Sequence, residues 1–424
     1  IRISIFKARM DLIYNSLFLN LYYKDSNHVG HLLPLFKSYA KKEINNQKNP
    51  IDIIDSFWDS NSSITGNDKV DFMFKVIQYV ERQIVLFDSI EDVTSPDALA
   101  DSKAIQINDI FSIQKDKNET AQFIQKLNDF RVRIVLTAHP TQFYRPPVLD
   151  IIAKLRNQIA ANNIENIDLL LHQLGLTSLV NSRSPSPLEE AKNIIHICRA
   201  YYYDAIGEFY FDLKQQYPEV KNHELVTLGF WPCGDRDGNP FVTHDTTKSV
   251  IDELRMSLMK CYYQDLKSLI AKLTFKDIEV ILLPLKDEIY DSMFNADHHI
   301  AYLEILDALE ACESILIQKY EGLYISDLQR LTAKVGIFKN HFASLDIRQD
   351  HDFHIKTIEY ILKKNQLIKH SVSDLTEDEL INLLTSQFIE IPEVSAEEGE
   401  IYDTIKNIAQ LKSIQQANGV EGCH

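Results

Sequence analysis

The chain has 424 residues, of which 44 are basic and 61 acidic, and its net charge is −17 at neutral pH. This length suffices for one large hydrophobic core or for several smaller ones. The acidic balance excludes nucleic-acid binding through the general electrostatic field, so local arginines must meet any anionic substrate.

Five cysteines lie far apart and form no CxxC or Cys/His pattern of metal-ligand spacing. We expect reduced thiols in a cytoplasmic protein. Polar residues cut the apolar N-terminal stretch well short of the ~18 residues that span a bilayer, so we expect no membrane anchor and no signal peptide. The sequence runs from Ile1 to His424, and we expect it to be part of a longer product. The cysteines are Cys198, Cys233, Cys261, Cys312 and Cys423.

The first part of the chain, residues 1–130, is expected to form an N-terminal helical region. An apolar stripe with spacings of three and four predicts an amphipathic helix whose apolar face is core. Residues 92–119 are polar with a weak period, which predicts a long surface connection. The stripe consists of Val70, Met73, Ile77, Val80, Ile84 and Phe87.

Three short β-like runs interrupt the helical pattern, at residues 131–137, 226–231 and 342–347. Each run leads directly into polar, chemically capable residues. Strands that carry reactive groups at their carboxyl ends and alternate with helices are typical of an α/β barrel with its active site at one face.

Two helices between these runs have clear signals. Ser186-Pro187-Leu188-Glu189 combines an N-cap hydroxyl, a proline at the first helical position and a glutamate that completes a capping box. Farther along, apolar residues from Tyr302 to Leu316 share one side of a segment and acidic residues mainly the other, which predicts a partly buried helix.

The first β-like run leads into Ala138, His139 and Pro140. A histidine at a strand end is more often a hydrogen-bonded structural residue than a catalyst. Its imidazole nevertheless suits proton transfer near neutral pH. His139 is therefore a candidate general base.

The second run ends in a glycine-rich turn that alternates carboxylates with a guanidinium and an amide. An EF-hand calcium loop has glycine at its sixth position and glutamate at its twelfth, whereas here Gly238 is fourth and Thr246 twelfth. The turn either holds itself together through backbone N–H groups and ion pairs or contacts substrate directly. Its candidate residues are Asp235, Arg236, Asp237 and Asn239.

Arg348 directly follows the third run. Its guanidinium is either an anion-binding group or one half of a structural ion pair with a neighbouring carboxylate.

Three of these segments, in this order, resemble the signature motifs of the phosphoenolpyruvate carboxylase family. They are Val135-Leu-Thr-Ala-His-Pro-Thr141, the glycine-aspartate-arginine segment from Gly229 to Thr243, and Ser344-Leu-Asp-Ile-Arg-Gln349, with a weaker match over Ser186–Ala191. The resemblance covers most of the chain from about Arg131 onward.

The chain departs from the family pattern in two places. Pro146 follows Arg145 where family members often carry a second arginine, and Pro232-Cys233 stands where methionine and glycine are usual. Neither departure removes a group to which a chemical role is assigned here.

The resemblance implies a predominantly α-helical α/β fold, the N-terminal part of a phosphoenolpyruvate carboxylase-type α/β barrel with many surrounding helices. Residues 131–424 would supply the first strands and surrounding helices of an incomplete barrel. The remainder, in a C-terminal half of the same polypeptide, would carry the ligands for Mg²⁺ or Mn²⁺, so we expect no metal ligand in this chain. An intact homotetramer is expected, with neither nucleic acid nor membrane as a partner.

The family joins phosphoenolpyruvate to bicarbonate and releases oxaloacetate and phosphate, an anaplerotic carbon fixation. The resemblance implies that His139 is the catalytic base, that Arg348 and Arg236 bind substrate, and that Asp235, Asp237 and Asn239 support the site as a loop. The 424-residue chain alone is expected to be inactive.

Two other functions stay open at this point. One is a noncatalytic anion-binding or scaffold protein derived from the same fold. The other is a metal-dependent hydrolase built on His139, Asp235 and Asp237, which no ligand spacing supports.

Overall fold

The computed structural model describes residues 7–8, 10–13, 29–60, 66–100, 117–137, 144–179, 185–237, 239–295 and 298–424. They belong to two compact units, one within residues 1–110 and 140–183 and the other within 111–139 and 184–424. We call these the N-terminal unit and the sheet unit. No helix among the described residues is both long and apolar enough to cross a membrane.

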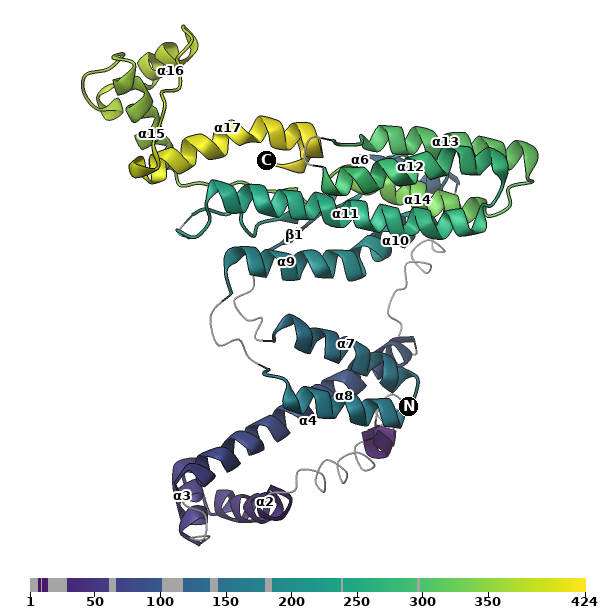
Figure 1. Ribbon diagram of the computed structural model, residues 1–424, viewed down its shortest axis with the longest axis vertical. Coiled ribbons are helices and arrows are strands. Elements are labelled where there is room, and N and C mark those ends of the chain that lie inside the picture. The colour runs from purple at the N-terminus through teal and green to yellow at the C-terminus, as the bar shows by residue number, and fades with distance from the viewer. Residues whose placement is uncertain are drawn as a thin grey trace. The chain divides into compact units, whose positions relative to one another are not determined.

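Helices build the N-terminal unit (Figure 1). Helix α4 packs against α7 and α8, which also pack against each other, and α2 packs against α3. Buried aliphatic side chains of α4, α7 and α8 form one core cluster. The helices are α2 (Val29–Asn45), α3 (Pro50–Ser60), α4 (Asn67–Ala100), α7 (Pro146–Ala160) and α8 (Ile164–Leu176).

The predicted core face of α4 is wrong. Most of the stripe is exposed, including Val70 and Ile84 at 56% and 51%, and only Met73 is half-buried. A different set of α4 residues is buried, because this helix has apolar residues on more than one side. The exposed stripe residues are Val70, Ile77, Val80, Ile84 and Phe87, and the buried set includes Phe72, Val76, Tyr79, Val85, Leu86 and Ile90.

The predicted surface connection over residues 92–119 is also wrong at both ends. Helix α4 continues to Ala100, and α6 already begins at Lys117. Residues 101–116 lie outside the described part of the chain.

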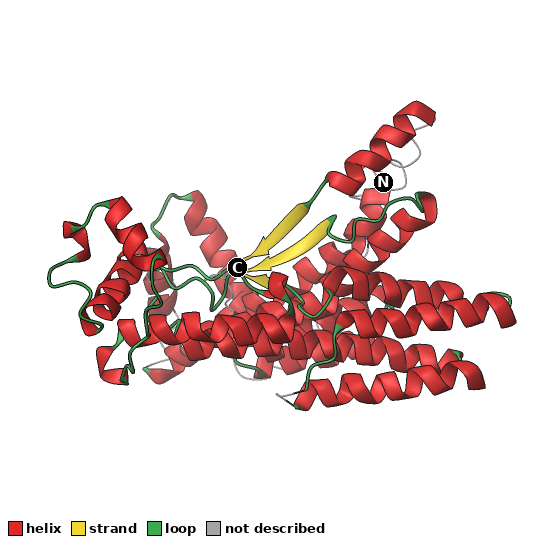
Figure 2. Ribbon diagram, turned by 90° about the horizontal axis from the view of Figure 1, so that it is seen from above, coloured by secondary structure: helices red, strands yellow, loops and turns green. Residues whose placement is uncertain are grey.

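The sheet unit contains three parallel strands in the order β1, β2, β3, which confirms the three predicted β runs. They are β1 (Val132–Leu136), β2 (Val226–Phe230) and β3 (Ser344–Leu345). Val132 pairs with Val226, and Gly229 pairs with Ser344. The arrows point the same way in Figure 2. The fold is therefore predominantly helical α/β, and its described strands form an open sheet.

The C-terminal residues pair with the far side of β3. Cys423 forms a parallel bridge with Leu345. The backbone N–H of His424 donates to the Leu345 carbonyl at 2.9 Å, and the N–H of Ile347 donates to the His424 carbonyl at 2.7 Å. Figure 2 places this terminus at the tips of the arrows. The parallel ladder thus continues beyond β3.

Long helices make up most of the rest of this unit. Helices α11 to α14 pack in sequence, and α14 also packs against α10 and α11 (Figure 1). The helices of the unit are α6 (Lys117–Asp129), α9 (Pro187–Ile197), the π-helical turn η1 (Cys198–Tyr202), α10 (Tyr203–Gln216), α11 (His244–Lys272), α12 (Lys276–Phe294), α13 (Tyr302–Lys319), α14 (Ile325–Phe338), α15 (His351–Lys364), α16 (Glu377–Thr385) and α17 (Glu400–Asn418), with short 3₁₀ turns η2 (Val372–Asp374), η3 (Ala396–Glu398) and η4 (Val420–Gly422).

Both helix predictions for this unit are confirmed. Ser186 caps α9: its hydroxyl accepts the Glu189 N–H at 3.3 Å, and the Glu189 carboxylate accepts the Ser186 N–H at 2.8 Å. In α13, Leu309 and Leu316 are fully buried while the acidic residues lie mainly toward water.

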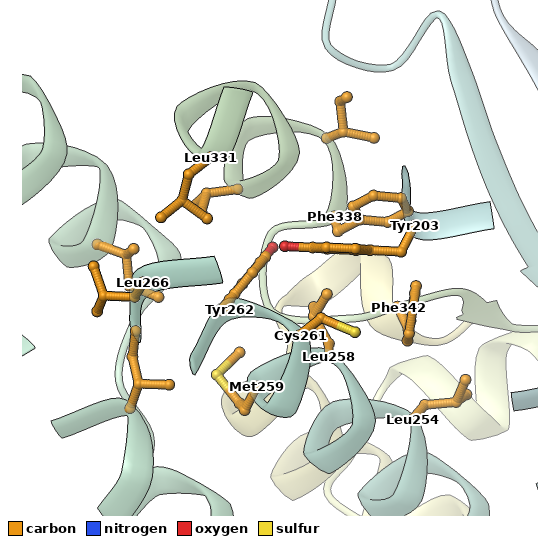
Figure 3. Close-up of a cluster of buried hydrophobic side chains, with 14 of the residues drawn as sticks. Tyr203, Leu254, Leu258, Met259, Cys261, Tyr262, Leu266, Leu331, Phe338 and Phe342 are labelled. Carbon is orange, nitrogen blue, oxygen red and sulfur yellow. The ribbon is translucent and has the colours of Figure 1, made fainter. Parts of the chain in front are cut away.

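The core of the unit includes buried side chains of α10, α11 and α14, several of which are labelled in Figure 3. The ring of Tyr203 stacks on Phe338 with centroids 5.4 Å apart. Fully buried Tyr262 donates its hydroxyl to the Lys339 carbonyl at 3.0 Å, which satisfies its only polar group. Phe230 of β2 and Leu345 of β3 belong to the same cluster, so the packing fixes the strands that lead into the site.

Candidate active site

The turn after β2 brings the backbone very close to β3. The N–H groups of Gly234 and Asp235 both donate to the Trp231 carbonyl at 2.9 Å. A side chain at Gly234 would place its Cβ 2.3 Å from the Asp346 carbonyl oxygen, so only glycine fits. Cys233 adopts a φ of 62° in this turn, a left-handed conformation that costs a residue with a side chain.

The turn then pairs with the segment that follows β3. The Arg348 N–H donates to the Gly234 carbonyl at 2.9 Å, and the Arg236 N–H donates to the Arg348 carbonyl at 3.0 Å. Two segments more than a hundred residues apart in sequence thereby lie side by side at the carboxyl edge of the sheet.

The side chain of Arg348 lies at this edge and is 48% exposed. Its Nη1 lies 3.5 Å from an Asp235 carboxylate oxygen, and its Cζ lies 4.9 Å from the centroid of the Trp231 ring. Among the described residues it has no second hydrogen-bond acceptor. Several of its guanidinium donors are therefore available to an anion.

Trp231 is itself fixed by Asp346 of the third motif. The indole Nε1–H donates to one Asp346 carboxylate oxygen at 2.8 Å. Arg133 of β1 donates to the other carboxylate oxygen at 2.5 Å and to the Ser344 carbonyl at 3.2 Å. One carboxylate therefore links all three strands.

The side chain of Arg236 is buried, with only 5% exposed. Its Nε donates to Gln349 at 3.0 Å, and its Nη2 is hydrogen-bonded to Asp403 of α17. Asp403 also accepts the backbone N–H of His244 at 2.8 Å. Arg236 thus contacts α17 rather than either neighbouring aspartate, and it does not line the pocket at the strand ends.

The other predicted loop residues form local hydrogen bonds. The Asp235 carboxylate accepts the Asp237 N–H at 3.4 Å, and the Asn239 side chain accepts the Phe241 N–H at 3.1 Å. Asp237 and Asn239 are exposed. These contacts agree with a loop that stabilises its own conformation.

A pocket of about 420 Å³ lies beside these residues. Burial raises the pKa of the Glu190 carboxyl, which is one of its lining groups. His139 lies outside the described residues, but Thr137, two residues earlier, lines the pocket. The lining residues are Thr137, Pro187, Glu190, Trp231, Pro232, Cys233, Asp235, Asp237, Asn239 and Val242.

The described residues do not fit a metal ion. Nowhere in the part of the chain that the structure describes do three or more His, Cys, Asp or Glu side chains converge in a way that could hold one. Glu190, Asp235 and Asp237 share the pocket lining without forming such a set.

Four residues of the site were missed as individuals by the sequence analysis: Arg133, Glu190, Trp231 and Asp346. Trp231 and Asp346 lie within the motif segments, and Glu190 lies within the weaker match. The motifs could have identified these three, but no sequence signal pairs Arg133 with Asp346, which lies 213 positions away.

The fold and site together define a mostly helical α/β protein with an anion-accessible arginine at the carboxyl edge of a parallel sheet. The family model described as phosphoenolpyruvate carboxylase matches residues 71–299 and 285–424. The chain therefore belongs to the phosphoenolpyruvate carboxylase family.

Curated relatives carry the same family name. The phosphoenolpyruvate carboxylase of Haemophilus influenzae (strain 86-028NP) is 25% identical over 390 residues, which cover 79% of this chain and 44% of the relative. Those of Vibrio parahaemolyticus and Shewanella loihica are 26% and 27% identical, and the matches cover 59% and 69% of this chain. The chain spans less than half the length of these relatives, 28% and 39% in the latter two.

Proposed function

We propose that this chain is the N-terminal portion of a phosphoenolpyruvate carboxylase, which converts phosphoenolpyruvate and bicarbonate to oxaloacetate and phosphate. The observation that carries the proposal is the partly unpaired Arg348 at the sheet edge, within a chain of this family. The phosphate of phosphoenolpyruvate offers the oxygen atoms that a guanidinium binds best.

In this proposal His139 is the base. Transfer of the phosphoryl group to bicarbonate gives carboxyphosphate and the enolate of pyruvate. His139 takes the proton from carboxyphosphate, which then breaks down to phosphate and carbon dioxide, and the enolate carbon attacks the carbon dioxide to form oxaloacetate. The place of Thr137 in the pocket lining supports this role, because it puts the end of β1 beside the pocket.

Arg348 holds the phosphate in the proposed site. Asp235, Asp237 and Asn239 keep the loop in shape, as their local hydrogen bonds suggest. For Arg236 the buried contacts with Gln349 and Asp403 favour a role in organising the site through loop position over direct contact with substrate.

The sheet is proposed to be one part of an α/β barrel. The two valines of β1 are partly exposed, Val132 at 39% and Val135 at 37%. A closed barrel would bury such apolar strand residues, so their exposure favours further strands and helices packing against β1. The pairing of Cys423 with β3 supports continuation of the parallel ladder. Open sheet edges favour association with further strands.

The 424-residue chain alone is proposed to be inactive. Its pocket lining includes three carboxylates, Glu190, Asp235 and Asp237, and no basic side chain among the described lining residues. A multiply charged anion needs more positive charge than Arg348 provides in this setting. The remaining cations, and the residues that hold Mg²⁺ or Mn²⁺, would come from the rest of the polypeptide.

The direct test is oxaloacetate formation by the full-length protein, coupled to NADH oxidation by malate dehydrogenase. We expect bicarbonate-dependent turnover that His139→Asn abolishes or reduces by at least ~100-fold, the scale of general-base catalysis. Absence of turnover in the wild-type protein, with phosphoenolpyruvate binding retained, would instead identify a noncatalytic anion-binding protein. Full activity of His139→Asn would refute its assigned role.

A further inference from the structure

We propose that Asp346 is a positioning residue for phosphoenolpyruvate binding, which acts by holding the Trp231 ring against the guanidinium of Arg348. The inference rests on the proposed function, because it takes Arg348 as the group that binds the phosphate. It adds two residues, Asp346 and Arg133, that the motif assignments leave without a role.

The first step is the contact between Arg348 and Trp231. The guanidinium carbon lies 4.9 Å from the ring centroid, within the range of a cation–π interaction. The only hydrogen-bond partner of this guanidinium among the described residues is Asp235, at 3.5 Å. A half-exposed arginine with one long ion pair would sample many rotamers, so the ring is the main surface that fixes its direction.

The second step is the contact between Trp231 and Asp346. The backbone of Trp231 is held by hydrogen bonds, but its indole ring can rotate about the side-chain bonds unless the ring N–H has a partner. Its Nε1–H donates to Asp346 at 2.8 Å, a charge-assisted hydrogen bond that fixes the ring orientation.

The third step is the support of Asp346 by Arg133. Arg133 binds the second carboxylate oxygen at 2.5 Å, and the Asp346 side chain is only 18% exposed. The guanidinium of Arg133 lies directly over Gly229: a Cβ on this glycine would be 2.8 Å from Arg133 Nε. Gly229 therefore gives Arg133 the space to cross β2 and reach β3.

These contacts form one continuous path from β1 to the proposed phosphate group. Arg133 orients Asp346, Asp346 orients Trp231, and Trp231 supports Arg348. Neither Arg133 nor Asp346 lines the pocket, and the side-chain contacts of Asp346 reach Arg348 through Trp231, which does line it.

The test is a double-mutant cycle in the full-length protein. The dissociation constant for phosphoenolpyruvate is measured by titration calorimetry for wild type, Asp346→Ala, Arg348→Ala and the double variant, and kcat and KM are measured in parallel. We expect Asp346→Ala to weaken binding about threefold to tenfold, the scale of a cation–π contact. KM should rise by a similar factor with kcat nearly unchanged, because the contact acts on substrate binding.

In the Arg348→Ala background, Asp346→Ala should have almost no further effect on affinity, since the group through which it acts is gone. Trp231→Phe keeps a ring but removes the N–H, and it should give a smaller loss of affinity. This variant carries the test if Asp346→Ala does not fold.

Glu224→Ala is the matched control, because Glu224 is also an acidic partner of arginine and lysine but lies at the amino end of the sheet, with Arg131 at 2.8 Å. It should leave affinity unchanged. Equal losses from Asp346→Ala in the presence and absence of Arg348 would overturn the inference and show only a structural role. If phosphoenolpyruvate binds and Asp346→Ala weakens its binding as expected, but no turnover occurs, the carboxylase activity is refuted and the positioning role of Asp346 is supported. If the wild-type protein does not bind phosphoenolpyruvate, both proposals are refuted.

Discussion

Basic side chains lie at both ends of the parallel sheet, but their surroundings differ. At the amino end, Lys339 binds Glu224 at 2.8 Å and also pairs with Glu421, and Arg131 binds Glu224. At the carboxyl end, Arg348 has one ion pair at 3.5 Å and is 48% exposed. A pocket of about 260 Å³ at the amino end is lined by both Arg131 and Lys339, so neither a pocket nor positive charge identifies the site by itself. The carboxyl end differs in that Arg348 has solvent-accessible N–H donors without a hydrogen-bond acceptor among the described residues.

Arg236 shows that position along the strands does not decide this difference. It follows β2 at the carboxyl end, yet its side chain is buried against Asp403 and Gln349. Asp403 compensates its charge as Glu224 and Glu421 do for Lys339, although its buried Nη1 has no hydrogen-bond partner among the described residues.

The largest predicted effect is a loss of stability that tests whether Asp403 compensates the charge of Arg236. Asp403→Ala leaves the Arg236 guanidinium buried without its carboxylate, so we expect a loss of ~3–5 kcal/mol in the free energy of unfolding. Urea denaturation followed by circular dichroism measures it. Replacing both partners with apolar residues, as in Arg236→Met/Asp403→Leu, should recover much of the loss. A single variant as stable as wild type would contradict the assignment.

The next largest effect is a dependence of folding stability on pH, caused by His341 at the amino end of the sheet. The pKa of His341 is lowered to about 4 from the ordinary value of 6.5, mainly by burial. A hydrogen bond to the Asn418 carbonyl and nearby Glu421 oppose this shift, whereas the charges of Lys339 and His424 add to it. Between pH 6.5 and 4 the unfolded chain binds the proton and the folded chain does not, so stability falls as pH falls, by at most ~3 kcal/mol.

Chemical denaturation at pH 7, 6, 5 and 4 checks this prediction. His341→Gln should flatten the decline in that window. The decline below pH 4 should persist in the variant, because the Glu359 carboxylate, with a pKa lowered to about 2 by its hydrogen bonds to Lys363 and Ser371, titrates there. An unchanged slope between pH 6.5 and 4 in His341→Gln would count against a buried neutral imidazole.

The smallest predicted effect concerns Glu224, which pairs with Lys339 and Arg131 at the amino end. Glu224→Ala should cost ~1 kcal/mol or less, since Lys339 keeps Glu421 and Arg131 is 71% exposed. Thermal unfolding of the variant and of wild type gives this difference. A loss of several kcal/mol would mean that the amino end depends on this carboxylate far more than its exposure indicates.

Local sequence signals predicted the elements that position the site. The three β runs and the capping box at Ser186 could be predicted from the sequence, because strands and helix caps are determined largely by residues close together in the chain. The contact between Asp235 and Arg348 was not predicted, although both residues were placed at strand ends.

Contacts between residues far apart in the chain could not be predicted from the sequence. The α4 stripe was assigned to the core although Val70 and Ile77 are exposed, because a helix with two apolar faces does not reveal which one packs. Arg236 pairs with Asp403, 167 positions away, rather than with an adjacent aspartate. Only tertiary packing brings α17 to the loop.

The most direct test of the central claim is the affinity of the full-length protein for phosphoenolpyruvate after Arg348→Ala, measured by calorimetry beside Glu224→Ala. Loss of charge-assisted hydrogen bonds to the phosphate should weaken binding by about 10- to 150-fold. Glu224→Ala should bind as wild type does. Wild-type affinity in Arg348→Ala would contradict the assignment of the anion site to the carboxyl end of the sheet.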